Sequence, residues 1–303
     1  MDAMHPLELS LLLHQALEPR ARGFLERVAA PVWWEDTEAL HQARVASRRL
    51  RAVLRLLDPS LYPGLKRHQK RLEGFTELMG GLRELDVHTQ ILEELGPELP
   101  GPHGWAALEH ILELLTLQRS RLRRRLPTQV EDLELGKLAA LIPTPDIPYP
   151  FQAATAAEAA WSQMEPFVEA IGSAVPEQQK EEDPAALHRL RIQAKKLRYT
   201  MEILAPLFTH GIEAPLRELK ALQTVLGDHH DYAGLELRLQ TLLDGLESRG
   251  RRVLVDGTQA ILFHLAQERA THYDRFREIA DLFAQPGLGR ELHSRLGLAG
   301  ETA

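Results

Sequence analysis

The chain has 303 residues and a net charge of −7, from 36 basic and 43 acidic residues, which argues against a protein that coats nucleic acid but allows a local basic groove. Hydrophobic residues make up 44% and charged residues 26%, which excludes a wholly disordered chain. The absence of cysteine excludes disulfides, thiolate catalysis and cysteine-bound zinc.

Residues 1–6 are acidic rather than basic and lack the layout of a signal peptide, and no uninterrupted apolar run reaches about 18 residues. We therefore expect a cytoplasmic protein with no membrane partner. Aromatic residues are only 6% of the chain while leucine-rich periodic runs dominate, which favours helices over sheets.

Helical periodicity predicts four helices in the first half of the chain, at residues 7–30, 37–57, 62–95 and 104–126. Pro19 should kink or restart the first of them. Asp36 or Thr37 is a suitable N-cap for the second, which should end before Asp58 and Pro59. The fourth ends in an arginine-rich run, residues 119–125, which we interpret as compensation of the helix dipole plus a solvated face.

Residues 127–150 contain five prolines and are predicted to link two halves, residues 1–150 and 151–303. The second half again predicts four helices, at residues 151–175, 185–206, 212–247 and 252–284. Asp183 followed by Pro184 provides the start of the second of these, and Pro286 with Gly287 should end the last. The expected class is all-α.

The helix at residues 37–57 carries a basic strip. Between residues 41 and 57 there are five arginines, one histidine and no acid. At 3.6 residues per turn, its cations lie within an arc of roughly 80°, and an apolar face that includes Leu50 lies opposite. These cations are His41, Arg44, Arg48, Arg51 and Arg55. A face of one charge sign without acids needs an anion.

The strip occurs twice. His188, Arg191, Lys195 and Arg198 repeat it at an offset of 147 residues, the separation of His41 and His188. The fifth position differs, since Glu202 corresponds to Arg55. The segment from residue 18 to about residue 87 aligns with its copy 147 residues later without any insertion. The chain therefore contains an internal duplication.

A dedicated anion site explains the strips better than a solvated face, because exposed helix faces usually mix charge signs. Arginine binds phosphate through two parallel hydrogen bonds, and lysine adds a compact charge. One cation per turn, with a rise of about 5.4 Å, suits an extended polyanion. The two histidines are expected to donate hydrogen bonds to phosphate rather than to act in catalysis.

A second repeated feature follows each strip, as Gly80 and Arg83-Glu84 in the first half and Gly227 and His230-Asp231 in the second. We expect the glycine to allow close helix approach and the carboxylate to orient a strip residue. His230 and Asp231 also resemble the metal ligands of a phosphohydrolase, although the corresponding Arg83 cannot bind a metal. A Glu-x-x-His spacing at Glu38 and His41 is typical of di-iron bundles, but its counterpart in the second half lacks the glutamate.

The doubled Leu-His-x-x-Arg-hydrophobic-x-x-basic-basic-Leu-Arg helix, with the Gly-x-x-Arg-Glu-x-Asp-Val segment after the first copy, resembles the CHAD family, the conserved histidine α-helical domain. The resemblance implies two tandem pseudo-symmetric four-helix bundles around a basic central groove or pore that binds inorganic polyphosphate, and association with polyphosphate granules. The residues that match the implied site are His41, Arg44, Arg48, Arg49, Arg51, Arg55, Lys70, His188, Arg191, Lys195, Lys196, Arg198 and Arg217.

We therefore expect a non-enzymatic polyphosphate-binding protein with no cofactor and no specific nucleic-acid partner. Two alternatives remain open. One is a metal-dependent phosphohydrolase or metal-binding protein that uses the histidines. The other is a scaffold that brings protein partners to polyphosphate, because helix faces that bind partners look like solvated faces.

Overall fold

The computed structural model describes residues 6–30, 33–99, 101–142, 156–180, 182–284 and 287–298. Within these ranges the chain forms helices and no strand, which confirms the all-α class. The first half contains α1 (Pro6–Ala29), α2 (Thr37–Leu56), α3 (Leu65–Leu95), the 3-10 helix η1 (Gly96–Glu98), α4 (Gly101–Asp132) and η2 (Leu135–Leu141). The second half contains α5 (Ala156–Gln178), α6 (Pro184–Leu204), η3 (Ala205–Leu207), α7 (Glu213–Glu247), α8 (Arg252–Ala280), η4 (Asp281–Phe283) and α9 (Gly287–Arg295).

The two basic helices begin as their capping residues predict. The Asp36 carboxylate accepts a hydrogen bond of 2.6 Å from the backbone N–H of Ala39 at the start of α2. Asp183 caps α6 in the same way, through the N–H groups of Ala185 and Ala186. Each cap satisfies donors that the first helical turn leaves unpaired, and so fixes the residue at which the basic helix begins.

Prolines do not divide the helices as expected. α1 runs through Pro19, and α4 runs through Pro127 to Asp132, six residues beyond the predicted end at residue 126. Leu126 is buried, and Val130 packs on the same core. This apolar packing on both sides of Pro127 offsets the hydrogen bond that proline cannot make. The linker prolines after residue 142 lie outside the described residues, and α9 is a helix that the periodicity did not predict.

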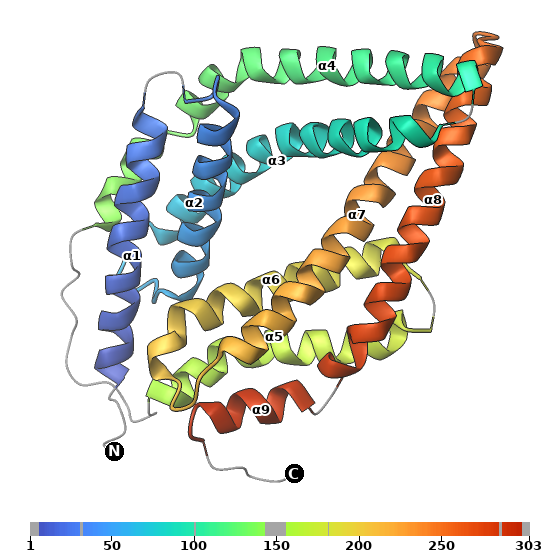
Figure 1. The fold of residues 1–303 in the computed structure, drawn as a ribbon. Coiled ribbons are helices and arrows are strands. Elements are labelled where there is room, and N and C mark those ends of the chain that lie inside the picture. The colour runs from blue at the N-terminus through green and yellow to red at the C-terminus, as the bar shows by residue number, and fades with distance from the viewer. Residues whose placement is uncertain are drawn as a thin grey trace.

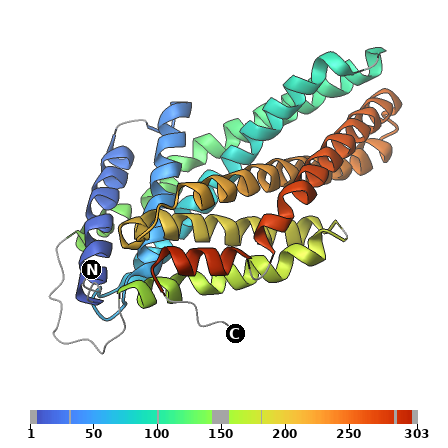
Figure 2. The ribbon, with the colours of Figure 1, turned by 60° about the horizontal axis from the view of Figure 1, so that its bottom comes forward.

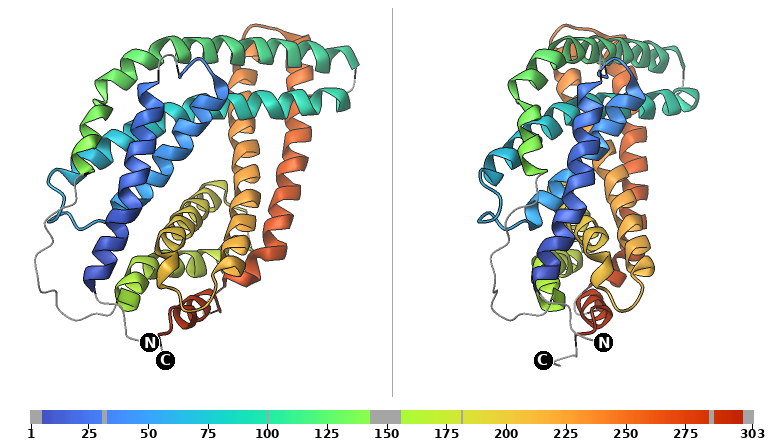
Figure 3. Two further views of the ribbon diagram at one scale, coloured as in Figure 1. Left: turned by 60° about the vertical axis from the view of Figure 1, so that its left-hand side comes forward. Right: turned by 90° about the vertical axis from the view of Figure 1, so that its left-hand side faces the viewer.

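The long helices pair side by side. α3 lies along α4 and α7 lies along α8, and α4 also packs on α8 (Figure 1). Both pairs extend in the same direction away from α1 (Figure 2), and two further views show α7 and α8 still adjacent (Figure 3). Near α1, the pairs join α2, α5 and α6: α3 packs on α2, α7 packs on α6, and the two basic helices α2 and α6 contact each other.

Both hydrophobic cores draw on both halves of the sequence. The larger core includes Leu50 of α2 and Leu197 of α6, each fully buried. The smaller core, at the far ends of the long pairs, includes Ile111 of α4 with Leu239 of α7 and Ile261 of α8. The division into two tandem pseudo-symmetric bundles stays a prediction, because residues from before and after position 150 share these cores.

Candidate anion-binding site

The basic strips of the two halves meet where α2 packs on α6. Behind the strips, the buried leucines of both helices enter the larger core, which leaves the charged faces beside each other. Four cations come close enough to perturb one another. We call them the central cluster: Arg44, Arg48, Arg191 and Lys195.

The pKa values in the central cluster record burial and mutual repulsion. Burial lowers the pKa of Lys195 to about 7, and the charges of Arg191, Arg48 and Arg44 add to this effect. Burial and then Arg48 likewise lower the pKa of Arg44 to about 10. A desolvated group of like-charged side chains disfavours its own charged form, so a bound anion would relieve the repulsion.

None of the four cations of the central cluster forms an ion pair with another described residue. The Nε atoms of Arg48 and Arg191 are buried without a hydrogen-bond partner, as is Nδ1 of His188. Buried donors normally have partners, and leaving one unsatisfied costs about 1–3 kcal/mol. The outer nitrogens of the two guanidinium groups carry the donors that a ligand could reach.

His188 extends the central cluster toward α7. Its ring lies against that of His230, with 4.0 Å between the centroids and 35° between the planes. Burial, then the neighbouring His188, Arg191 and Lys195, lowers the pKa of His230 to about 3. Burial followed by the charge of Arg191 also lowers the pKa of His188. Both rings are therefore neutral near pH 7, and each can donate one N–H.

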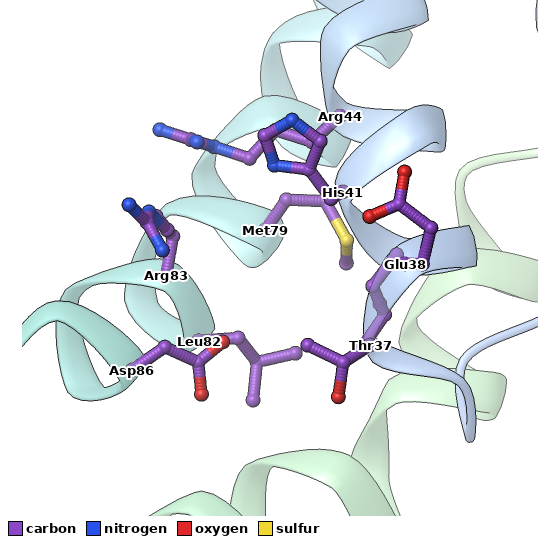
Figure 4. A pocket seen from close by; sticks show the side chains of 9 residues that line it. Thr37, Glu38, His41, Arg44, Met79, Leu82, Arg83 and Asp86 are labelled. Carbon is purple, nitrogen blue, oxygen red and sulfur yellow. The ribbon is translucent and has the colours of Figure 1, made fainter. Parts of the chain in front are cut away.

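The first half contributes a pocket of about 210 Å³ beside Arg44, between α2 and α3 (Figure 4). His41 lies at this pocket, and the guanidinium groups of Arg44 and Arg83 lie on the same side of it. Arg83 is not among the predicted site residues. One feature of the sequence could have identified it: Arg83 belongs to the repeated Arg83-Glu84 pair and corresponds to His230 in the second half.

The repeated carboxylates are not equivalent in space. Asp231 lies in the field of Arg191 and Lys195; burial raises its pKa and these cations lower it. Glu84 instead accepts a 2.7 Å hydrogen bond from Arg238 of α7, so the prediction that it orients a strip residue is wrong.

The glycines differ too, and the prediction of close helix approach fails at both. A Cβ at Gly227 would lie 3.5 Å from Nε of Arg191, which is an ordinary contact with a side chain, whereas one at Gly80 would meet nothing within 4 Å. Gly227 therefore lies under the Arg191 guanidinium, and Gly80 is not required for packing.

Beyond the central cluster, acids neutralise part of the strips. Arg51 pairs with Glu73 at 3.3 Å. Arg198 pairs with Glu202 at 2.9 Å and also donates to Gln223. Glu202 is the residue that interrupts the second strip, and its pairing explains why the two strips are unequal at this end.

The remaining predicted residues lie apart from the central cluster. Lys196 lies 5.8 Å from the ring centroid of Phe167, and burial followed by the charges of Arg55 and Arg51 lowers its pKa. Arg49 faces α1 rather than the central cluster. Lys70 and Arg217 are exposed on α3 and α7 and form no ion pair with another described residue.

The arginine-rich run of α4 does not lie at a helix end, so its interpretation as dipole compensation is wrong. Arg119 pairs with Asp86 of α3 at 2.6 Å, and Arg123 donates to Oγ1 of Thr37 at 3.2 Å. These contacts dock α4 on α3 and on the start of the first basic helix. Arg121, Arg124 and Arg125 are exposed.

In the part of the chain that the structure describes, no group of three or more histidine, aspartate or glutamate side chains is arranged to hold a metal ion. No helix in the same ranges is long and apolar enough to cross a membrane.

Fold and site together define an all-helical protein whose two halves bring unpaired cations into one cluster. The chain belongs to the CHAD domain family, whose model matches residues 15–240. The crystal structure of the CHAD domain from the plant Ricinus communis is similar, with a TM-score of 0.67 and 23% identity over 93% of each chain. PptA from Streptomyces chartreusis has a TM-score of 0.62 and 16% identity, over 90% of this chain and 99% of that one. A comparison with curated proteins gives no match.

Proposed function

We propose that this protein binds inorganic polyphosphate at the central cluster and does not act as an enzyme. The observation that carries the proposal is the meeting of four cations, Arg44, Arg48, Arg191 and Lys195, none of which forms an ion pair with another described residue, although Asp231 acts on them through its field. Family membership supports the choice of polyanion, because resemblance to the CHAD family implies polyphosphate. Location on polyphosphate granules, and any protein partners there, would follow from such binding.

Each residue type contributes differently to the proposed site. The guanidinium groups of Arg44 and Arg191 can each donate hydrogen bonds to two phosphate oxygens, whereas Lys195 supplies a point charge. The neutral rings of His188 and His230 can donate hydrogen bonds at one end. Because the cations lie on two helices, they present an extended surface rather than a closed pocket, which suits a chain of phosphates better than a single small anion.

Calorimetric titration with long-chain polyphosphate at low and physiological salt tests this function. Duplex DNA at the same phosphate concentration is the control polymer. We expect binding to weaken as salt rises, because each phosphate contact releases counterions. Polyphosphate binding should nevertheless survive at physiological salt where DNA binding does not. Equal weak binding of both polymers would contradict a dedicated polyphosphate site and favour a role of the basic strips in bundle assembly or in binding a protein partner.

The double variant R44A/R191A should weaken polyphosphate binding about tenfold or more, because it removes two groups that bind phosphate bidentately. The matched control is R121A/R124A, which removes the same charge from exposed positions on α4. It should leave the affinity within about twofold after correction for net charge. An unchanged affinity in a folded R44A/R191A protein would exclude these residues from the site.

A further inference from the structure

A second pair of arginines lies outside the central cluster. Arg20 of α1 and Arg49 of α2 both line a cavity of about 410 Å³, which Tyr199 and Glu202 of α6 also line. The same two arginines line an adjoining cavity of about 190 Å³ between α1 and α2. Arg49 is rotated about 100° around α2 from Arg48, and no member of the central cluster lines either cavity.

The charges in this arginine pocket are unbalanced. Burial and then the charge of Arg49 lower the pKa of Arg20, which places the two guanidinium groups in each other's field. Glu202 acts on Arg20 more weakly, and its carboxylate already accepts a 2.9 Å hydrogen bond from Arg198. Arg20 donates one N–H to the carbonyl oxygen of Ala16, and its other N–H groups can donate to a ligand.

The internal duplication provides a comparison within the molecule. At the offset of 147 residues, Arg20 and Arg49 correspond to Phe167 and Lys196. There Lys196 lies over the Phe167 ring, a favourable cation–π pair. The second half thus supplies its cation with an aromatic partner, whereas the first half places two cations together. Packing alone does not require that arrangement.

We propose that the arginine pocket binds one phosphoryl dianion, independently of the polyphosphate chain on the central cluster. Two guanidinium groups converging on one cavity match the oxygens of a phosphate group. The dianion could come from free orthophosphate or from the end of a short polyphosphate chain. Apolar Pro19, Ala52 and Ile203 complete the wall of the larger cavity.

The test uses the full chain carrying R44A/R191A, so that the central cluster is disabled, and titrates it calorimetrically with orthophosphate and with tripolyphosphate. We expect one saturable site. Adding R20Q/R49Q should weaken it about tenfold or more, whereas adding R22Q, an exposed arginine two residues along α1, should change it less than about twofold. If R20Q/R49Q does not fold, the single substitution Arg49→Gln, at an exposed position, is compared with R22Q instead.

Binding of orthophosphate would assign the pocket to the free ion, and binding of tripolyphosphate alone would assign it to chain ends; either supports the pocket. Absence of saturable binding of both anions, or equal loss with R22Q, would overturn it. Failure of the proposed function gives a different result: long-chain polyphosphate would bind the wild type and R44A/R191A with equal affinity, whether or not the arginine pocket binds phosphate.

Discussion

Lys195 is the residue at which protonation and anion binding should be most strongly coupled. Its pKa of about 7 in the free protein leaves the amine largely neutral at pH 8. A polyphosphate chain beside it would favour the charged form and return the pKa toward the ordinary value of 10.5. We therefore expect uptake of about one proton per protein molecule bound at pH 8, and an affinity that falls as pH rises above about 7.

Titrations in two buffers of different ionisation enthalpy measure this proton uptake directly. The Lys195→Arg variant is the matched control, because arginine keeps its charge and has no proton to gain in this range. It should bind polyphosphate with little proton uptake and with an affinity that depends less on pH. Uptake as large in the variant as in the wild type would assign the proton to another group.

Lys195 should also make the stability of the free protein depend on pH. Between pH 7 and about 10.5 the unfolded chain retains a proton that the folded chain has lost, so the free energy of unfolding should rise with pH, by at most about 1.4 kcal/mol per unit. Below pH 7 both states are charged and the full cost of burial remains. Lys195→Met should be more stable at pH 7 and should lack this slope, as urea unfolding at several pH values would show.

The strip residues were predictable from sequence, because one helix face with one charge sign is visible in the periodicity of Arg44, Arg48 and Arg191. Their three-dimensional neighbours were not. Arg83 joins Arg44 only through the packing of α2 on α3, and Arg20 meets Arg49 only through that of α1 on α2. A periodic pattern identifies a face, but it does not identify which other face lies opposite.

At the scale of elements, α8 and α4 approach closely at Gly257. A Cβ there would lie 2.1 Å from the carbonyl oxygen of His103 and 2.6 Å from the Cβ of Ala107. Because the first of these atoms belongs to the backbone, the helices would have to separate. Gly257→Ala should therefore lower the free energy of unfolding by about 1–3 kcal/mol, the usual cost of overpacking.

Gly245→Ala in α7 is the matched control, since a Cβ at Gly245 would meet nothing within 4 Å. It should stabilise the protein by about 0.5–1 kcal/mol through the helix propensity of alanine. Thermal unfolding of both variants compares the two effects in one assay. A stabilising Gly257→Ala would contradict the close approach of α4 and α8.

Element boundaries were predictable where a cap or a breaker acts locally, as at Asp36 and Asp183. They were not predictable where tertiary packing decides. The rule that proline ends a helix failed at Pro127, because Leu126 and Val130 hold both sides of the proline against the core. α9 was missed because its nine residues make only about two and a half turns, too few for a periodic pattern to stand out although the helix is amphipathic.

For the whole molecule, the duplication was readable from sequence, but the way the halves combine was not. A repeat at 147 residues is equally compatible with two adjacent bundles and with one shared framework. The structure places α2 on α6 and α4 on α8, so contacts between halves build both the central cluster and the far core. The anion site therefore depends on the halves being together.

Residues 1–150 and 151–303, produced separately, should each fail to unfold cooperatively. In the far core, Leu92 and Ile111 of the first half pack with Leu239 and Ile261 of the second, and all four are at most 2% exposed. Exposing one such side chain costs about 1.5–3 kcal/mol, so the loss of several is comparable with the usual domain stability of about 5–15 kcal/mol. Circular dichroism of each half during heating, and of an equimolar mixture, measures this. A sharp transition in either half alone would show that it is an independent bundle, whereas a transition only in the mixture would show that the cores, and with them the central cluster, require both.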